Sequence, residues 1–276
     1  MNVLRTLVFD DEVSLTIADT TSIAKEGIKR HALQGEAAEA FARTLAFLTF
    51  ASACLKMEAG SVSLAIKTDG KIVDLCASGD QALSIRGYLD WEEEKSDTLG
   101  TGTLAIIRDD GYNRPFVGAC EVASKEDIDN SFEDYYFTSE QLPTFIKTVL
   151  KRDSDGEVEF CGVIVAQPLP FASEETFAKI PDSYALEEIL NEVQTLGLFA
   201  VAEKYFGAKA ENCNYRQADY RCNCSREYLK GVIVSIGETE LRKMVKEDGS
   251  IKVHCHYCNT DYEFVDEDID ELFPKK

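Results

Sequence analysis

Two pairs of closely spaced cysteines, Cys222-Asn-Cys224 and Cys255-His-Tyr-Cys258, stand 30 residues apart near the end of the sequence. Cys222 and Cys224 are two positions apart, so both side chains point to the same face of an extended segment. A turn over the second motif brings Cys255 and Cys258 together in the same way. Two such pairs form a tetrahedral site of four sulfur ligands, as in structural zinc sites, where Zn–S distances are about 2.3 Å. The pattern therefore predicts a small zinc-binding domain with these four cysteines as ligands.

Two other interpretations of this region stay open. The four thiols could be a chance cluster of buried cysteines. His254 and His256 could also replace a cysteine as ligand, but they flank Cys255 and should point away from it on a strand. We therefore expect both histidines to be exposed or to lie just outside the ligand set.

The segment that holds the four cysteines, residues 216–276, is too small to be stable through its core alone. A domain of about 60 residues buries only ~60% of the surface of its unfolded chain. Structural zinc supplies an apparent ~10–16 kcal/mol to the folding of a small domain, so loss of the metal should unfold this segment. Thiolates are also the form of cysteine that oxidants attack. Oxidation of both pairs to disulfides would therefore remove the metal and its folding energy together.

The earlier part of the chain alternates strand and helix patterns. We predict an α+β protein with an N-terminal mixed α/β domain (residues 1–170), in which helices pack on a sheet, a helical linker (171–215) and the small C-terminal zinc-binding domain (216–276). In the first domain the strand patterns cover 3–9, 13–18, 61–66, 72–77, 102–107, 116–122 and 157–166, and the helix patterns cover 22–32, 36–56 and 139–151.

The linker predicts short amphipathic helices at 185–196 and 198–206. Isolated helices of this length are marginal in water. We therefore expect them to lie on a neighbouring element and to be only conditionally stable. In the last domain, helices are predicted at 225–236 and 238–246, and a hairpin is predicted from 251–253 and 262–265.

The chain is strongly acidic, with 29 Lys and Arg against 50 Asp and Glu and a formal charge of −21. This charge repels a phosphate backbone and an anionic membrane surface, so we expect no binding to nucleic acid or membrane. The longest uncharged apolar stretch, Thr44–Leu55, is far shorter than the ~20 residues of a membrane span. Acidic residues follow the start too early for an export signal. We expect a cytoplasmic protein.

The other five cysteines are less informative. Nine cysteines in total is an odd number, which fits poorly with a fully paired disulfide framework. Cys54, Cys76, Cys120 and Cys161 lie among apolar residues and are expected to be small core side chains. Cys213, in a polar stretch, is expected to be a passive thiol. The sequence has no GxSxG, P-loop or HExxH motif, so we expect no enzyme of those classes.

At its cysteines the chain resembles the redox-regulated 33 kDa chaperonin family, the zinc-thiolate holdase chaperones. The resemblance runs over almost the whole chain, and one departure is Cys161-Gly162, where family members often carry paired glycines. Besides the cysteine pairs it rests on Ile85-Arg86-Gly87-Tyr88 at the end of a strand, Thr138-Ser139-Glu140-Gln141 opening a helix, Gln167-Pro168-Leu169-Pro170 closing the first domain, Ser225, and Tyr262-Glu263-Phe264.

The resemblance implies an ATP-independent chaperone, not an enzyme, that is folded and largely inactive while reduced and zinc-bound. Cys222, Cys224, Cys255 and Cys258 would be both zinc ligands and switch thiols. Their oxidation to disulfides would release zinc and loosen the linker, and the oxidised form, often a homodimer, would hold unfolding client proteins. The residues alone leave the disulfide pairing open, and the resemblance favours pairing within each motif.

Two hypotheses from other classes stand beside this one. The first is a thiol-disulfide oxidoreductase that uses Cys255 and Cys258, although its CxxC motif lacks the βαβ context of such enzymes. The second is an interaction module in which zinc has only a structural role.

Overall fold

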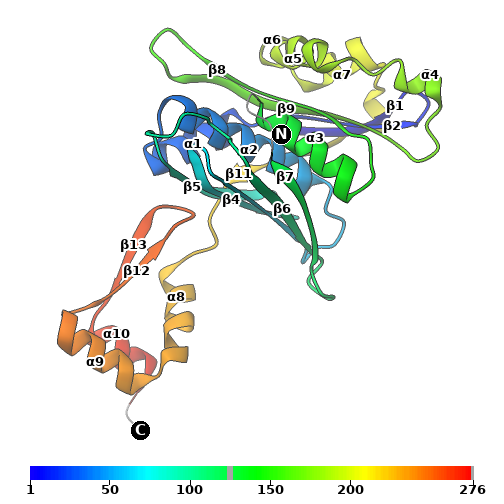
Figure 1. Cartoon of the computed structure of the whole chain (residues 1–276). Coiled ribbons are helices and arrows are strands. Elements are labelled where there is room, and N and C mark those ends of the chain that lie inside the picture. Colours follow the sequence, from blue (N-terminus) through cyan, green and yellow to red (C-terminus); the bar gives the residue numbers. More distant parts are fainter. Residues whose placement is uncertain (123–126, 275–276) are drawn as a thin grey trace. The chain divides into compact units, whose positions relative to one another are not determined.

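The protein is described by a computed structural model that covers residues 1–122 and 127–274 (Figure 1). It separates into two units, Met1–Arg221 and Cys222–Lys276, which are described in turn. Both units mix helices and strands, in agreement with the predicted fold class.

Two sheets form the framework of the first unit. The five-stranded sheet has the order β10-β1-β2-β9-β8 and is antiparallel throughout. The six-stranded sheet has the order β11-β5-β4-β3-β6-β7 and is antiparallel except where β11 joins β5. The strands are β1 (Val3–Val8), β2 (Val13–Asp19), β3 (Ser61–Thr68), β4 (Ile72–Asp80), β5 (Ser84–Trp91), β6 (Gly102–Asp109), β7 (Phe116–Val122), β8 (Phe145–Arg152), β9 (Val158–Pro168), β10 (Asn214–Arg216) and β11 (Asp219–Tyr220).

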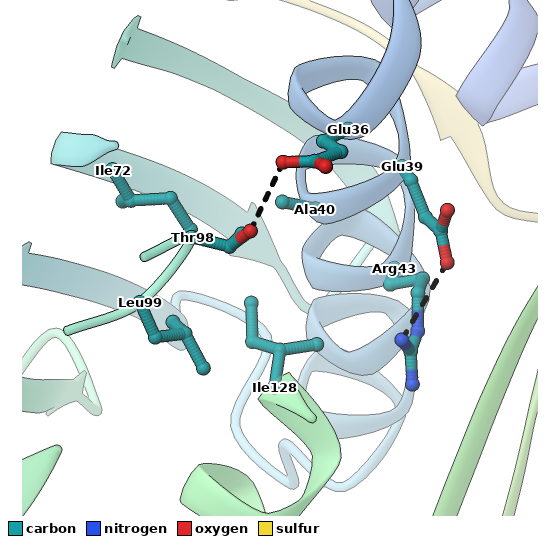
Figure 2. Close-up of a pocket in the computed structure, with 8 residues that line it drawn as sticks. All are labelled: Glu36, Glu39, Ala40, Arg43, Ile72, Thr98, Leu99 and Ile128. Carbon is teal, nitrogen blue, oxygen red and sulfur yellow. Dashed lines mark hydrogen bonds and ion pairs between the residues drawn. The ribbon is translucent and has the colours of Figure 1, made fainter. Parts of the chain in front are cut away.

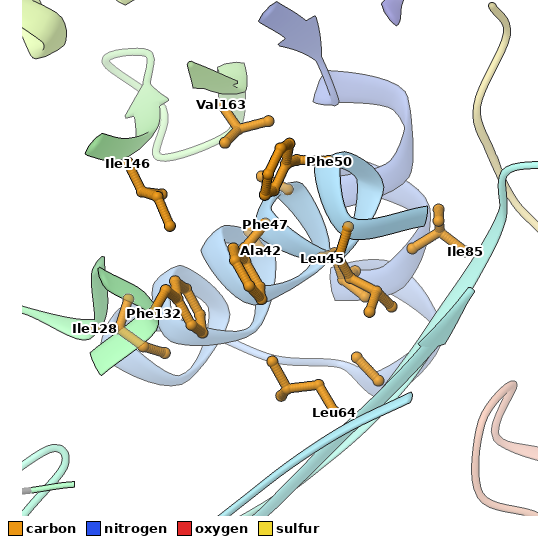
Figure 3. Packing of buried hydrophobic residues seen from close by; sticks show 14 of the residues in the cluster. Ala42, Leu45, Phe47, Phe50, Leu64, Ile85, Ile128, Phe132, Ile146 and Val163 are labelled. Carbon is orange, nitrogen blue, oxygen red and sulfur yellow. The ribbon is translucent and has the colours of Figure 1, made fainter. Parts of the chain in front are cut away.

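A long helix, α2 (Gly35–Ala53), fills the space between the two sheets together with α1 (Thr21–His31) and α3 (Ile128–Ser139). Its apolar residues cover most of its circumference and are buried, as its breadth of apolar side chains predicts. Figure 3 shows Leu45 on the side of α2 that faces β5, and Phe50 on the side toward β9. The ring of Phe47 stacks on Phe132 of α3 with centroids 3.9 Å apart.

The linker helices cover the opposite face of the five-stranded sheet (Figure 1). They are α4 (Glu174–Phe177), α5 (Ser183–Asn191), α6 (Val193–Leu196) and α7 (Leu198–Phe206). Leu190 and Val201 from these helices form one buried cluster with Leu15, Ile17 and Ile164 from the strands. The expectation that the short helices lie on a neighbouring element is therefore confirmed, and the neighbour is this sheet.

Residues 214–220 connect the edges of both sheets of the first unit. β10 pairs with β1, and β11 pairs with β5. These strands are too short to show a hydrophobic alternation, so the sequence does not reveal them. As a result the second unit of the structure begins at Cys222, whereas the sequence analysis places the end of the linker at residue 215.

The helix predicted at 139–151 is wrong. This region contains the end of α3, a turn, and strand β8 (Phe145–Arg152). The carboxylate of Asp127 caps α3 by accepting a hydrogen bond from the N–H of Asp129. Pro143 then prevents continuation of a helix, because it lacks an N–H and its ring clashes with the preceding turn. The motif Thr138–Gln141 consequently ends a helix instead of opening one.

The second unit is a small α/β fold with its own core. It contains α8 (Arg226–Ile233), the 3₁₀ turn η2 (Val234–Ile236), α9 (Glu238–Asp248), the hairpin of β12 (Ile251–Cys255) and β13 (Thr260–Phe264), and α10 (Asp266–Leu272). The predicted helices and hairpin are present, and α10 was not predicted. Its hydrophobic core is formed by the buried side chains of Leu229, Ile233, Leu241, Val245, Ile251, Phe264 and Ile269. Across both units, the described residues contain no helix long and apolar enough to cross a membrane.

Candidate metal centre

The four cysteines predicted as ligands come from two segments of the second unit. Cys222 and Cys224 lie in the extended segment before α8, which begins where the Ser225 hydroxyl accepts a hydrogen bond from the N–H of Tyr228. Cys255 ends β12, and Cys258 lies in the turn that leads to β13. Asn259 holds this turn in the left-handed region, with φ of 51°.

The structure brings the four sulfur atoms within 4.8 Å of one another. The Sγ atoms of Cys222 and Cys255 are 3.7 Å apart, and those of Cys224 and Cys258 are 3.1 Å apart. Zinc with four thiolates at about 2.3 Å places neighbouring sulfurs about 3.8 Å apart. The cluster therefore has the chemistry and the approximate spacing of a tetrahedral thiolate site, and it could hold a metal ion.

The four thiols differ in their surroundings. Cys258 is buried, and the other three are half-buried. Burial raises the pKa of the Cys222 thiol and that of Cys258. Burial acts in the same direction on Cys224, but hydrogen bonds from Tyr262 and from the neighbouring thiols prevail and lower its pKa to about 7. Cys224 is thus more ready than Cys222 or Cys258 to be a thiolate at neutral pH.

Tyr262 is a residue of this site whose contact the sequence analysis missed. Its hydroxyl oxygen lies 3.2 Å from Cys224 Sγ. In the sequence Tyr262 stands out only as part of a family motif, because the spacing of residues does not reveal a contact between positions 38 apart.

The two histidines beside Cys255 are not part of the cluster. His254 and His256 are exposed, as expected, and their rings contact each other with centroids 5.0 Å apart. Nδ1 of His254 lies 2.7 Å from the carboxylate of Asp261. Among the described residues, Cys222, Cys224, Cys255 and Cys258 form the one group of three or more His, Cys, Asp or Glu side chains that could hold a metal ion, and neither histidine belongs to it.

The remaining cysteines divide into two kinds. Cys161 is fully buried in the core, and Cys54 and Cys120 are half-buried against it, so the core prediction is confirmed for Cys161 and holds in part for the other two. Cys76 differs, because its half-buried thiol lies 3.2 Å from the Asp74 carboxylate instead of among apolar core residues. Cys213 is half-buried, and its thiol contacts the carbonyl of Lys209 at 3.3 Å.

The first unit contains a cavity of about 230 Å³ beside α2 (Figure 2). Glu36 accepts a hydrogen bond from the Thr98 hydroxyl, and Glu39 lies 3.7 Å from Arg43. Arg43 also contacts Asp127 and Asp129 at 2.5 and 2.7 Å. Arg43 is therefore surrounded by three carboxylates on this side of α2.

Comparison with known proteins agrees with the architecture described above. The family model described as "Hsp33 protein" matches residues 2–265. The chain belongs to the Hsp33 family. Two Hsp33 relatives, each named "33 kDa chaperonin", are those of Bacillus cereus strain G9842, 32% identical, and of Bacillus anthracis, 31% identical; each match covers 98% of this chain and 97% of the relative.

A solved Hsp33 structure has the same fold. The crystal structure of the 33 kDa chaperonin (heat shock protein 33 homologue) from Thermotoga maritima superposes with a TM-score of 0.81 at 27% identity, covering 98% of this chain and 96% of that one. The resemblance found in the sequence is therefore confirmed over nearly the whole chain. The relatives are named as chaperonins and not as enzymes. Helix α10 begins just after the last residue that the Hsp33 family model matches.

Proposed function

We propose that this protein is a redox-regulated, ATP-independent chaperone that binds unfolding proteins under oxidative stress and is inactive while reduced. The observation that carries this proposal is the cluster of four sulfur atoms within 4.8 Å, in a unit whose described residues form a core of seven buried apolar side chains. So small a core makes the fold of this unit depend on what the cysteines bind.

Cys222, Cys224, Cys255 and Cys258 would together hold one Zn²⁺ per reduced chain. When bound, the metal supplies four strong bonds to thiolates that tie the segment before α8 to the hairpin of β12 and β13. The half-buried positions of three of the sulfurs leave them open to small oxidants. The same four residues are therefore proposed as the switch thiols.

The redox step balances with a peroxide as oxidant. Two thiols give two electrons to hydrogen peroxide, an S–S bond forms, the O–O bond breaks, and two water molecules leave. A disulfide sulfur no longer carries the charge that binds a metal, so two such steps remove all four ligands. We propose pairing within each motif, Cys222 with Cys224 and Cys255 with Cys258. The sulfur contacts of 3.7 and 3.1 Å join cysteines of different motifs, so peptide mapping of the oxidised chain is the direct test.

Activation then requires that the helices of the linker, which spans residues 171–215, loosen from the five-stranded sheet. Its helices hold apolar side chains against the sheet, and undocking would expose both apolar faces to clients. The net charge of −21 keeps a protein that exposes such surface from associating with itself without limit. We further propose that the oxidised form is a homodimer and that the protein acts in the cytoplasm, without nucleic acid or membrane partners.

An oxidant titration with two readouts tests the proposal. Zinc release and suppression of the aggregation of a heat-unfolded client should rise together as peroxide is added. Cys222→Ser should remove the oxidant-dependent activity, while Cys213→Ser, a matched change outside the cluster, should leave it in place. Zinc release without any gain in suppression would contradict the switch and favour a module with structural zinc. Turnover in an insulin-reduction assay with a thiol donor would favour an oxidoreductase.

A further inference from the structure

Tyr262 links the two halves of the cysteine cluster. It lies on β13 opposite Val253 of β12, and its half-buried ring packs against the core of the second unit. Its hydroxyl reaches the segment before α8, where it lies 3.2 Å from Cys224 Sγ. A side chain fixed by core packing on one segment thus contacts a sulfur on the other.

We propose that Tyr262 is a positioning residue for Cys224. The phenol O–H of Tyr262 donates a hydrogen bond to the Cys224 thiolate, and this bond sets both the direction and the electron-donor strength of the sulfur. This inference rests on the proposed function, because it assigns Tyr262 a role toward the proposed metal centre. A thiolate has no proton to donate, so the hydrogen bond in the metal-binding state runs from the phenol O–H to the sulfur. A hydrogen bond to an ionised acceptor is stronger than one between neutral groups.

The hydrogen bond has two chemical consequences. It removes rotational freedom from Cys224 before a metal binds, which strengthens binding; loss of an outer partner of a metal ligand typically costs about 10–100-fold in affinity. It also withdraws electron density from the sulfur, so Cys224 becomes a weaker electron donor and reacts more slowly with an electrophilic oxidant. In the metal-bound chain Cys224 is a thiolate with or without the hydroxyl, so removal of the hydroxyl should weaken metal binding and speed oxidation at the same time.

The test uses the reduced full chain with Co²⁺ in place of zinc, since thiolate-to-cobalt charge-transfer bands report the donor strength of sulfur. Tyr262→Phe keeps the ring that packs in the core and removes only the hydroxyl. We expect the charge-transfer band to move to lower energy, the affinity for Co²⁺ to fall about 10-fold, and thiol oxidation by peroxide to accelerate. Tyr228→Phe on α8 is the matched control, because its side chain is 62% exposed, and it should behave as the unmodified chain.

A second variant separates this role from simple packing. 3-Fluorotyrosine at position 262 keeps the ring and makes the phenol a stronger donor, so its band should move to higher energy, opposite to that of Tyr262→Phe. Unchanged spectra and affinities in both variants would overturn the role of Tyr262 while leaving the metal centre intact. Failure of the unmodified chain to bind Co²⁺ or Zn²⁺ would overturn the proposed metal centre, and this inference with it.

Discussion

Replacing Leu190 of α5 by alanine should undock the linker helices without any change at the cysteines. Leu190 is fully buried, and it belongs to the cluster that joins the helices to the five-stranded sheet. Its Cδ1 also lies against the backbone of Gly162, only 3.2 Å from the place where a Cβ would be. The Leu190 side chain therefore cannot turn out into solvent while α5 stays docked on the sheet.

The magnitude follows from the burial of this side chain. Truncation of a buried leucine to alanine costs about 2–5 kcal/mol. Because every 1.4 kcal/mol is a factor of ten, the ratio of undocked to docked linker should rise at least about 30-fold. The reduced, metal-loaded variant should then suppress client aggregation without oxidant. Hydrogen exchange of the amides in α5 and α7 should accelerate by a similar factor.

The control is Leu196→Ala, the same chemical change at a position on α6 that is 47% exposed. It should leave both exchange and chaperone activity of the reduced protein unchanged. If Leu190→Ala lowers the stability of the whole first unit, but exchange in α5 and α7 is no faster than in the sheet, the linker does not undock as a separate element. That result would refute the reasoning.

Three further predictions concern charged side chains. Arg43→Met leaves the buried Asp129 without its guanidinium partner at 2.7 Å, so urea unfolding should show a loss of about 3–5 kcal/mol in the first unit, and a variant as stable as the parent would refute this. Burial raises the pKa of Glu133 to about 7, so the stability that its protonated form contributes is present below pH ~4.3 and is lost as the pH rises through 7. The difference in unfolding free energy between the parent protein and Glu133→Gln should therefore change between these two pH values. A difference that stays constant with pH would contradict the raised pKa. Asp268→Asn removes the carboxylate charge that faces Arg226 at 2.6 Å and weakens the hydrogen bond that caps the N–H of Val265. Amide hydrogen exchange in α10 should therefore accelerate, and an unchanged exchange rate would contradict this prediction.

The parts of the fold with a clear hydrophobic period could be predicted from the sequence. α2 is apolar over most of its surface, and the linker helices carry apolar residues on one face, so their burial followed from pattern alone. The prediction of a helix at 139–151 was wrong because the apolar residues of this region fit both the helical and the strand period. Phe145, Ile146 and Val149 suit a helix face, but in the structure they lie on strand β8, where pairing with β9 decides the conformation.

The sequence could predict which four cysteines come together, but not the side chains that surround them. The spacing within each cysteine pair places two sulfurs together, and the position of the histidines beside Cys255 directs them away, so both expectations could be made from local geometry. The contact of Tyr262 with Cys224 depends on how β13 packs in the core of the unit. Tertiary packing of this kind leaves no trace in residue spacing.

The pairing of β10 with β1 and of β11 with β5 has a consequence for reversibility. With these two strands still paired, an undocked linker would be a loop held at both ends, from the end of β9 to the start of β10. The entropy needed to close such a loop grows only slowly with its length, and here the closure is already made. Recapture of the helices is then a first-order event, independent of protein concentration. We therefore expect the linker helices to dock again on the five-stranded sheet as soon as the thiols are reduced and the metal is restored, without the help of another protein.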